Sequence, residues 1–305
     1  MNRRAEGRVI GFLYPGRKDA EFDSWRLGFA KALVERSWRE GDNLLIEWRF
    51  GEYDQTRYDR MAAELISAGA DVLVTAGTPL THALSRATQS IPIVTSVGDP
   101  VGSGFAVDLQ SPGHNITGLS RALREKARAQ IGLLVEMAPG VKTLMVPRSE
   151  RYGGIPELDA CLEGVAAECG MDFTVRTAES FAEVEFALGA LAGPATAATF
   201  VYAHGAFQFD ESTFASAAIR YGVVAAGDER RTVEAGCLMS YGLHHPDPEK
   251  SYASLVDRVL RGENPARIPF EMPTVPEIIV NRATAVALGL ALAPDLLQRA
   301  DAVIG

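Results

Sequence analysis

The sequence has little of what would mark a membrane-spanning, disulfide-linked or zinc-binding protein. No apolar run approaches the ~18 residues that a bilayer-crossing helix needs. There are three cysteines, Cys161, Cys169 and Cys237, and no CxxC pair, which argues against a structural zinc site. Cys161 and Cys169 lie on one predicted helix, ~12 Å apart at 1.5 Å per residue, too far to bridge. We expect them to be small buried side chains.

The sequence also lacks recognisable catalytic motifs and a net positive charge. The chain has no GxSxG, no Walker GxxxxGK[ST], no HExxH, and no GxGxxG after a strand. A dispersed catalytic set would escape this search, so an enzyme stays a minor alternative. The net charge of −9 argues against nucleic acid or an anionic membrane surface as partner. His244 and His245 are adjacent, point apart and have no suitably spaced third ligand, so we expect no metal and no cofactor.

What is present is a composition typical of an ordinary soluble protein, with 47% hydrophobic and 23% charged residues. At 305 residues the chain exceeds the usual size of one core, so two domains are expected. In the first third, apolar strands alternate with amphipathic helices, which is typical of a parallel sheet. These strands are expected at 9–14, 44–50, 70–76 and 91–96. The Gly/Pro-rich stretch 98–120 is interpreted as a crossing segment between domains.

A second alternating series predicts a second, similar α/β domain. Its strands are expected at 142–146, 171–176, 199–203 and 223–226, with helices between them. Segments 236–242 and 278–281 are interpreted as two further crossings, separated by an amphipathic helix over 248–260, and the tail is expected to extend neither sheet. The predicted fold class is α/β: two open parallel-sheet, Rossmann-like lobes joined by three crossing segments into a hinged clamshell.

Ligand-site candidates in the first lobe lie where strands end in small or polar residues followed by proline. Thr78, next to Gly77, could hold a carboxylate at a helix N-terminus, although a helix cap is the alternative role. Asp99 could accept from a ligand ammonium group, or close an Asx turn, and Ser96 is a weaker candidate.

Aromatic and second-lobe candidates complete the predicted site. Tyr14 and Pro15 could form a wall for a planar ligand, whereas Trp25 is expected to pack its helix on the sheet. The second-lobe candidates follow predicted strands. Arg148 and Arg151 could bind a carboxylate or phosphate, His204 and Phe207 could line the pocket, and Asp228 could anchor an amine.

Several segments, in this order and spacing, carry a resemblance to a known family. They include 41–49 (GDNLLIEWR), 76–79 (AGTP), 98–102 (GDPVG), 112–118 (PGHNITG), 236–242 (GCLMSYG) and 280–290 (VNRATAVALGL). The chain resembles ABC transporter substrate-binding proteins with the type I periplasmic-binding fold, in the group that includes tryptophan- and tyrosine-type binding proteins. The resemblance implies a first lobe of residues 8–119 with 243–276 and a second of 120–242 with 277–305, with the ligand between them. The chain departs from the family pattern at 147–154, 203–207 and 227–231, so the ligand stays open.

The resemblance implies a solute receptor of an ABC importer that captures an amino acid or a related, possibly aromatic, carboxylate by hinge closure. Its expected partners are this small molecule and a membrane permease, and it is expected to be a monomer. It is expected to be periplasmic or membrane-anchored outside the cytoplasm, with any signal segment absent from this chain. An effector domain of a transcription regulator is the alternative, but only seven residues precede the first strand and the charge is unsuitable for DNA.

Overall fold

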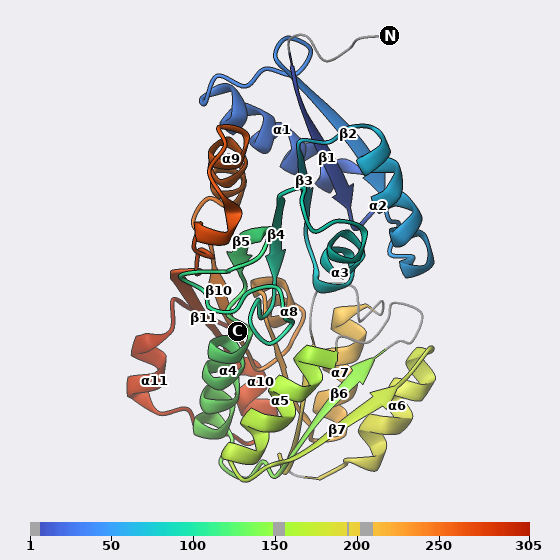
Figure 1. The fold of residues 1–305 in the computed structure, drawn as a ribbon. Helices are drawn as coiled ribbons and strands as arrows, with labels where there is room; N and C mark the ends of the chain where they lie inside the picture. Colours follow the sequence, from blue (N-terminus) through green and yellow to red (C-terminus); the bar gives the residue numbers. More distant parts are fainter. Residues whose placement is uncertain (1–6, 149–155, 194, 202–209) are drawn as a thin grey trace. The chain divides into compact units, whose positions relative to one another are not determined.

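The computed structural model describes residues 7–148, 156–193, 195–201 and 210–305 (Figure 1). By their internal contacts they form two compact units. The first combines Met1–Arg121 with His245–Pro273, and the second combines Ala122–His244 with Thr274–Gly305. Each unit is an open α/β structure around its own sheet, so the predicted fold class is confirmed.

The first unit is built on a parallel sheet of five strands in the order β2-β1-β3-β4-β5. Its strands are β1 (Arg8–Tyr14), β2 (Leu44–Phe50), β3 (Val72–Thr75), β4 (Ile93–Val97) and β5 (Ile116–Ser120). Its helices are α1 (Ala20–Val34), α2 (Tyr58–Ser67), α3 (Thr78–Ala87) and α9 (Pro248–Leu260), with 3₁₀ turns at η1 (Gln55–Arg57) and η3 (Pro265–Arg267).

Two hydrophobic layers cover the faces of this first sheet. Because side chains alternate along a strand, Val72 and Val74 pack on the layer of α1 and α9, whereas Leu73 packs on the layer of α2 and α3. Both faces are therefore buried, which explains the nearly uninterrupted apolar strands in the sequence.

An aromatic cluster fixes α1 on the sheet. The Asp19 side chain caps the helix by accepting from the Phe22 N–H at 2.9 Å. Trp25 stacks on Phe29 and meets Phe12 edge to face, each with ring centroids 5.1 Å apart. Trp25 thus packs its helix on the sheet, as the sequence predicted.

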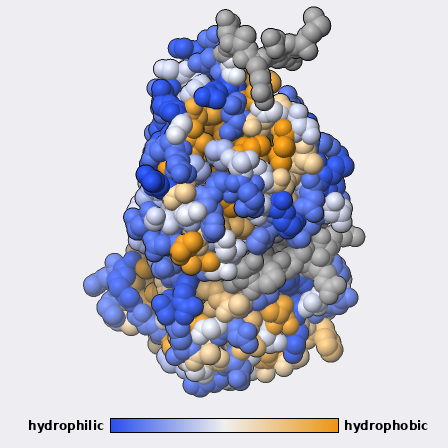
Figure 2. Space-filling view, in the orientation of Figure 1, coloured by the Kyte–Doolittle hydropathy of each residue, from blue (hydrophilic) through white to orange (hydrophobic). Residues whose placement is uncertain are grey.

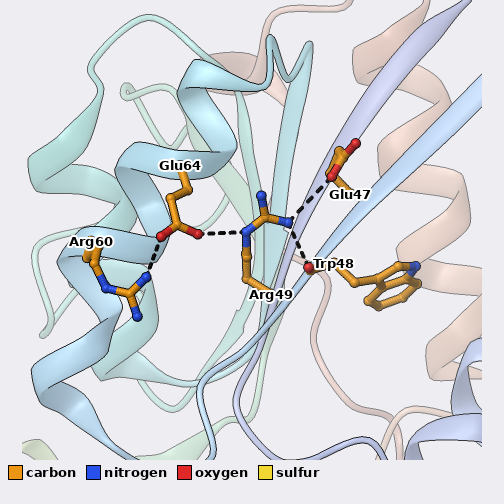
Figure 3. A network of polar contacts seen from close by, with 5 residues as sticks. All are labelled: Glu47, Trp48, Arg49, Arg60 and Glu64. Carbon is orange, nitrogen blue, oxygen red and sulfur yellow. Dashed lines mark hydrogen bonds and ion pairs between the residues drawn. The ribbon is translucent and has the colours of Figure 1, made fainter.

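The edge strand β2 is tied to α2 by charged side chains (Figure 3). Arg49 donates to the Glu64 carboxylate at 2.8 Å and to the Trp48 carbonyl at 2.9 Å, and Arg60 also donates to Glu64. Glu47 lies 3.4 Å from the Arg49 guanidinium. Charged groups along an exposed strand edge discourage pairing with another chain.

The second unit has a seven-stranded sheet in the order β12-β11-β10-β9-β8-β6-β7. Its strands are β6 (Thr143–Arg148), β7 (Asp172–Thr177), β8 (Ala197–Val201), β9 (Val224–Gly227), β10 (Met239–His244), β11 (Val275–Asn281) and β12 (Ala302–Ile304). Strand β11 runs antiparallel to β10, and every other neighbouring pair is parallel.

Helices cover both faces of the second sheet. Their bounds are α4 (Leu123–Met137), α5 (Pro156–Glu168), α6 (Phe181–Ala190), α7 (Glu211–Arg220), α8 (Arg230–Glu234), α10 (Arg282–Ala287) and α11 (Pro294–Arg299). Helices α4 and α5 contribute to one hydrophobic cluster, and α6 and α7 to another. The helix predicted over 248–260 belongs to the first unit, where it packs as α9.

Two expectations about the connecting segments were wrong. Residues 116–120 form β5 rather than part of a crossing, because Gly118 lets this strand approach Thr95 closely: a Cβ there would lie 1.8 Å from the Thr95 carbonyl oxygen. The tail extends the second sheet through β10, β11 and β12. Backbone pairing with distant strands, which hydropathy does not report, decided both cases.

The surface and the cysteines complete the description. Figure 2 shows hydrophilic residues over much of the drawn face, with hydrophobic residues in small groups. Within the described ranges, no helix has the length and apolar character needed to cross a bilayer. Cys237 is buried, and burial raises the pKa of its thiol to about 12. Cys169 is exposed, so the expectation of a buried side chain was wrong there.

Candidate functional site

The N-terminus of α3 lies at the carboxyl edge of the first sheet, directly after β3. Gly77 is its N-cap residue, with φ 99°, a conformation that favours glycine, and its N–H donates to the Ser96 carbonyl at 2.8 Å. Thr78 is therefore the first helical residue rather than the cap. The residue is 8% exposed, and its hydroxyl makes no hydrogen bond to the described residues. The first-turn N–H groups and this hydroxyl form an arrangement suited to an anion.

Buried hydroxyl groups hold the strand ends beneath this helix. Tyr252 of α9 donates to the Thr75 carbonyl at 2.8 Å, and the Ser96 side chain hydrogen-bonds to the same phenol. Burial raises the pKa of Tyr252, so its hydroxyl stays protonated and remains a donor. The Thr75 hydroxyl in turn donates to the Leu13 carbonyl at 2.7 Å. These bonds join the ends of β1, β3 and β4 to a helix far along the chain.

A second hydroxyl pair supports the turn between β3 and α3. The Thr81 and Thr95 hydroxyl oxygens are 2.7 Å apart and buried, and Thr81 also donates to the Gly77 carbonyl at 2.9 Å. Such fully hydrogen-bonded buried groups rigidify a site rather than react in it.

Asp99 closes a turn after β4. Its Oδ1 accepts from the N–H groups of Val101 and Gly102, at 3.1 and 2.8 Å. A Cβ at position 102 would lie 2.4 Å from Asp99 Oδ2, so a larger residue there would displace the Asp99 side chain. The Asx turn that the sequence offered as the alternative role is present.

Tyr14 and Pro15 join the end of β1 to the end of β2. The Tyr14 ring meets Phe22 edge to face, with centroids 4.9 Å apart. The Tyr14 and Pro15 carbonyls accept from the N–H groups of Gly51 and Tyr53 at 2.8 and 2.9 Å. Both residues are half-buried at the same carboxyl edge as Thr78 and Ser96.

In the second unit, Asp228 directly follows β9 and is engaged by a lysine. Lys126 Nζ of α4 lies 3.1 Å from Asp228 Oδ2, and the two side chains are 12% and 4% exposed. The ammonium that meets Asp228 in this structure is thus the protein's own.

Arg148 is the last residue of β6, and its side chain also pairs with a charged group of the protein. Both terminal nitrogens of its guanidinium donate to the Asp159 carboxylate of α5, so its fork is not open to a ligand as the sequence suggested. Its buried Nε has no hydrogen-bond partner among the described residues. Arg151, His204 and Phe207 lie outside the described residues.

A separate cavity of about 420 Å³ lies in the first unit, at the amino ends of β4 and β5. Pro92, Asn115 and Pro265 are among its lining residues. It lies at the sheet edge opposite to the predicted site residues. Within the part of the chain that the structure describes, no group of three or more His, Cys, Asp or Glu side chains could hold a metal ion.

Sequence reasoning missed the supporting residues Tyr252, Lys126 and Asp159. Thr75, a threonine at the end of an otherwise apolar strand, was a sequence signal for part of the hydroxyl network. The Lys126–Asp228 contact joins residues 102 positions apart, and no local sequence pattern around either residue predicts it.

The chain has two open α/β units, and in each the polar candidate side chains lie at the carboxyl edge of a mainly parallel sheet. This architecture is that of the type I periplasmic-binding class of fold. The chain belongs to the family of ABC transporter substrate binding proteins, whose model matches residues 18–304.

Individual relatives agree with this assignment. The chain is 24% identical over 270 residues to a tyrosine-binding protein of Clostridioides difficile, covering 88% of this chain and 77% of that protein. A conserved domain protein from Vibrio cholerae has a similar fold, with 24% identity, a TM-score of 0.79, and coverage of 98% and 100%. An ABC domain from Streptococcus pneumoniae in complex with L-Trp gives 23% identity, a TM-score of 0.77 and the same coverage. These relatives do not favour a regulator's effector domain.

Proposed function

We propose that this chain is the solute receptor of an ABC importer, that it works outside the cytoplasm, and that it binds a small carboxylate. The observation that carries the proposal is the α3 N-terminus, where glycine caps the helix and the Thr78 hydroxyl makes no hydrogen bond to the described protein. A carboxylate there would accept from the N–H groups of Thr78 and Leu80 and from this hydroxyl, since Pro79 has no N–H and the Thr81 N–H donates to the Gly77 carbonyl.

The ligand class is an amino acid or a related carboxylate, with an aromatic side chain the favoured form. The relatives named for tyrosine and L-Trp support this range, as does Tyr14 at the same sheet edge. The remaining contacts would come from the second lobe, and closure of the two lobes on the ligand would create the form that a permease recognises. We expect the receptor to act as a monomer.

The test combines native mass spectrometry of the purified protein with titration calorimetry against amino acids and small carboxylates. We expect a retained or added ligand of one carboxylate class, and Thr78→Val to weaken its binding about tenfold by removing one hydrogen bond to a charged group. Ser85→Ala, on the same helix but away from its N-terminus, is the control and should bind as the wild type does. A folded protein that binds no member of the panel would refute the proposal.

A further inference from the structure

The phenol of Tyr252 reaches from α9 to the carboxyl edge of the first sheet. The residue is 4% exposed, and its ring meets Trp25 edge to face with centroids 5.8 Å apart. The ring also belongs to the hydrophobic layer that contains Val72 and Val74. Its hydroxyl hydrogen is donated to the Thr75 carbonyl at 2.8 Å. A phenol has a single hydrogen to donate, so this one has none left for a ligand and acts on protein groups.

Two short paths lead from this phenol to the first turn of α3. Thr75 is the last residue of β3 and lies just before the turn in which Gly77 caps the helix. Since the phenol donates to Thr75, its oxygen accepts from the Ser96 hydroxyl. The Ser96 carbonyl in turn accepts the Gly77 N–H at 2.8 Å. One hydroxyl group therefore holds both the strand that leads into α3 and the residue that fixes its cap.

The orientation of the cap residue depends on such hydrogen bonds. Gly77 has φ 99°, and a glycine by itself has many other conformations open to it. Its carbonyl accepts from the Thr81 N–H at 3.1 Å and from the Thr81 hydroxyl at 2.9 Å, while its N–H is held by Ser96. The direction in which the Thr78 N–H and hydroxyl face follows from the way Gly77 is held.

We propose that Tyr252 and Ser96 are positioning residues for carboxylate binding, and that they fix the orientation of the Gly77–Thr78 turn that receives the ligand. The inference rests on the proposed function, and it gives Ser96 a role other than the ligand contact expected from the sequence. Hydrogen bonds weaken steeply when their geometry is poor, so a loosely held binding group loses affinity. Loss of the phenol hydroxyl therefore weakens binding although Tyr252 does not contact the ligand.

The test is titration calorimetry of Tyr252→Phe with each standard amino acid, 3-phenylpropionate and benzoate as probes. It is run well below the unfolding transition, where circular dichroism shows every variant folded. Lower stability then leaves Kd unchanged by itself, because the folded fraction is close to one. For the probe that the wild type binds most tightly, Tyr252→Phe should raise Kd about fivefold, which matches the net value of one hydrogen bond.

The possible failures are distinct. An unchanged Kd in folded Tyr252→Phe overturns the inference and leaves the proposed function standing. If the folded wild type binds none of the probes, the proposed function fails and the inference fails with it.

Two control variants separate positioning from stability. Tyr58→Phe removes a phenol hydroxyl that is buried in the same unit and hydrogen-bonds to no described residue. Gly69→Ala introduces backbone strain at φ 83°, between α2 and the amino end of β3. Both should bind the probe with the wild-type Kd. A Kd raised as much in Gly69→Ala as in Tyr252→Phe would mean that affinity follows stability, which overturns the inference.

Ser96→Ala completes a double-mutant cycle and covers the case in which Tyr252→Phe does not fold. By itself it should raise Kd about threefold, and an unchanged Kd overturns the inference. Because Ser96 and Tyr252 act as one hydrogen-bonded pair, the double variant should bind within about twofold of the weaker single variant. A Ser96 hydroxyl that touched the ligand directly would make the two losses multiply, and that result overturns its positioning role.

Discussion

Replacing Tyr252 with phenylalanine tests whether the hydroxyl network holds the strand ends of the first unit. The ring is buried and meets Trp25 with centroids 5.8 Å apart, so Tyr252→Phe keeps the packing and creates no cavity. Only the bond to the Thr75 carbonyl at 2.8 Å and the contact with Ser96 are lost.

The size of the effect follows from leaving buried polar groups without their partner. A buried acceptor that loses its donor costs ~1–3 kcal/mol, more than the ~1 kcal/mol net value of an average hydrogen bond. We therefore expect Tyr252→Phe to lower the free energy of unfolding by about 2 kcal/mol. For a domain of this kind that corresponds to a fall in Tm of ~4–8 °C.

The assay is urea unfolding followed by tryptophan fluorescence. Trp25, Trp38 and Trp48 are the chain's three tryptophans and all belong to the first unit, so the signal reports this unit selectively. Tyr58→Phe is the matched control: Tyr58 is 5% exposed in the same unit, and its hydroxyl hydrogen-bonds to no described residue. The control should change the free energy of unfolding by less than ~0.5 kcal/mol. A change that small in Tyr252→Phe, or an equal loss in both variants, would refute the reasoning.

Two further predictions concern the backbone and pH. Gly118→Ala should prevent stable folding of the first unit, at a cost above ~3 kcal/mol, because its Cβ would lie 1.8 Å from the Thr95 carbonyl oxygen. Gly69→Ala, at φ 83° with open space around it, should cost only ~1 kcal/mol, and equal urea midpoints for these variants would contradict the argument. The hydrogen bond from Arg49 lowers the pKa of Glu64, so its stabilising effect is present above the unfolded value of ~4.3 and is lost as pH falls through the lower folded value. The difference in urea midpoint between wild type and Glu64→Gln should therefore be constant above about pH 5 and shrink below about pH 4; a difference that grows on acidification would have the wrong sign.

Much of the fold could be predicted because local patterns carry it. The strand expected over 44–50 is β2 (Leu44–Phe50), and the helix expected over 248–260 is α9 (Pro248–Leu260). In each, the spacing of apolar residues matches the period of the element. The strand β5 was missed because Gly118 and its polar neighbours look like a loop, and only pairing with β4 makes them a strand.

For the candidate site, its location could be predicted from sequence, but the contacts of its side chains could not. The strand-to-loop junctions at Gly77–Thr78 and at Asp99 could be located from sequence, since short polar segments after apolar strands mark the carboxyl edge of a parallel sheet. Whether each of these side chains is available to bind a ligand could not be predicted from sequence. Asp99 turned out to close its own turn, and the Arg148 fork is taken by Asp159.

The sequence by itself determined two alternating α/β units, the edges at which their polar loops gather, and the resemblance to ABC substrate-binding proteins. These depend on periodicity and on motifs within a few residues. Only the tertiary structure decided that Tyr252 holds the ends of β3 and β4, and that Lys126 occupies Asp228. Such contacts join residues more than a hundred positions apart, so their partners are set by how helices pack on sheets and not by any local pattern.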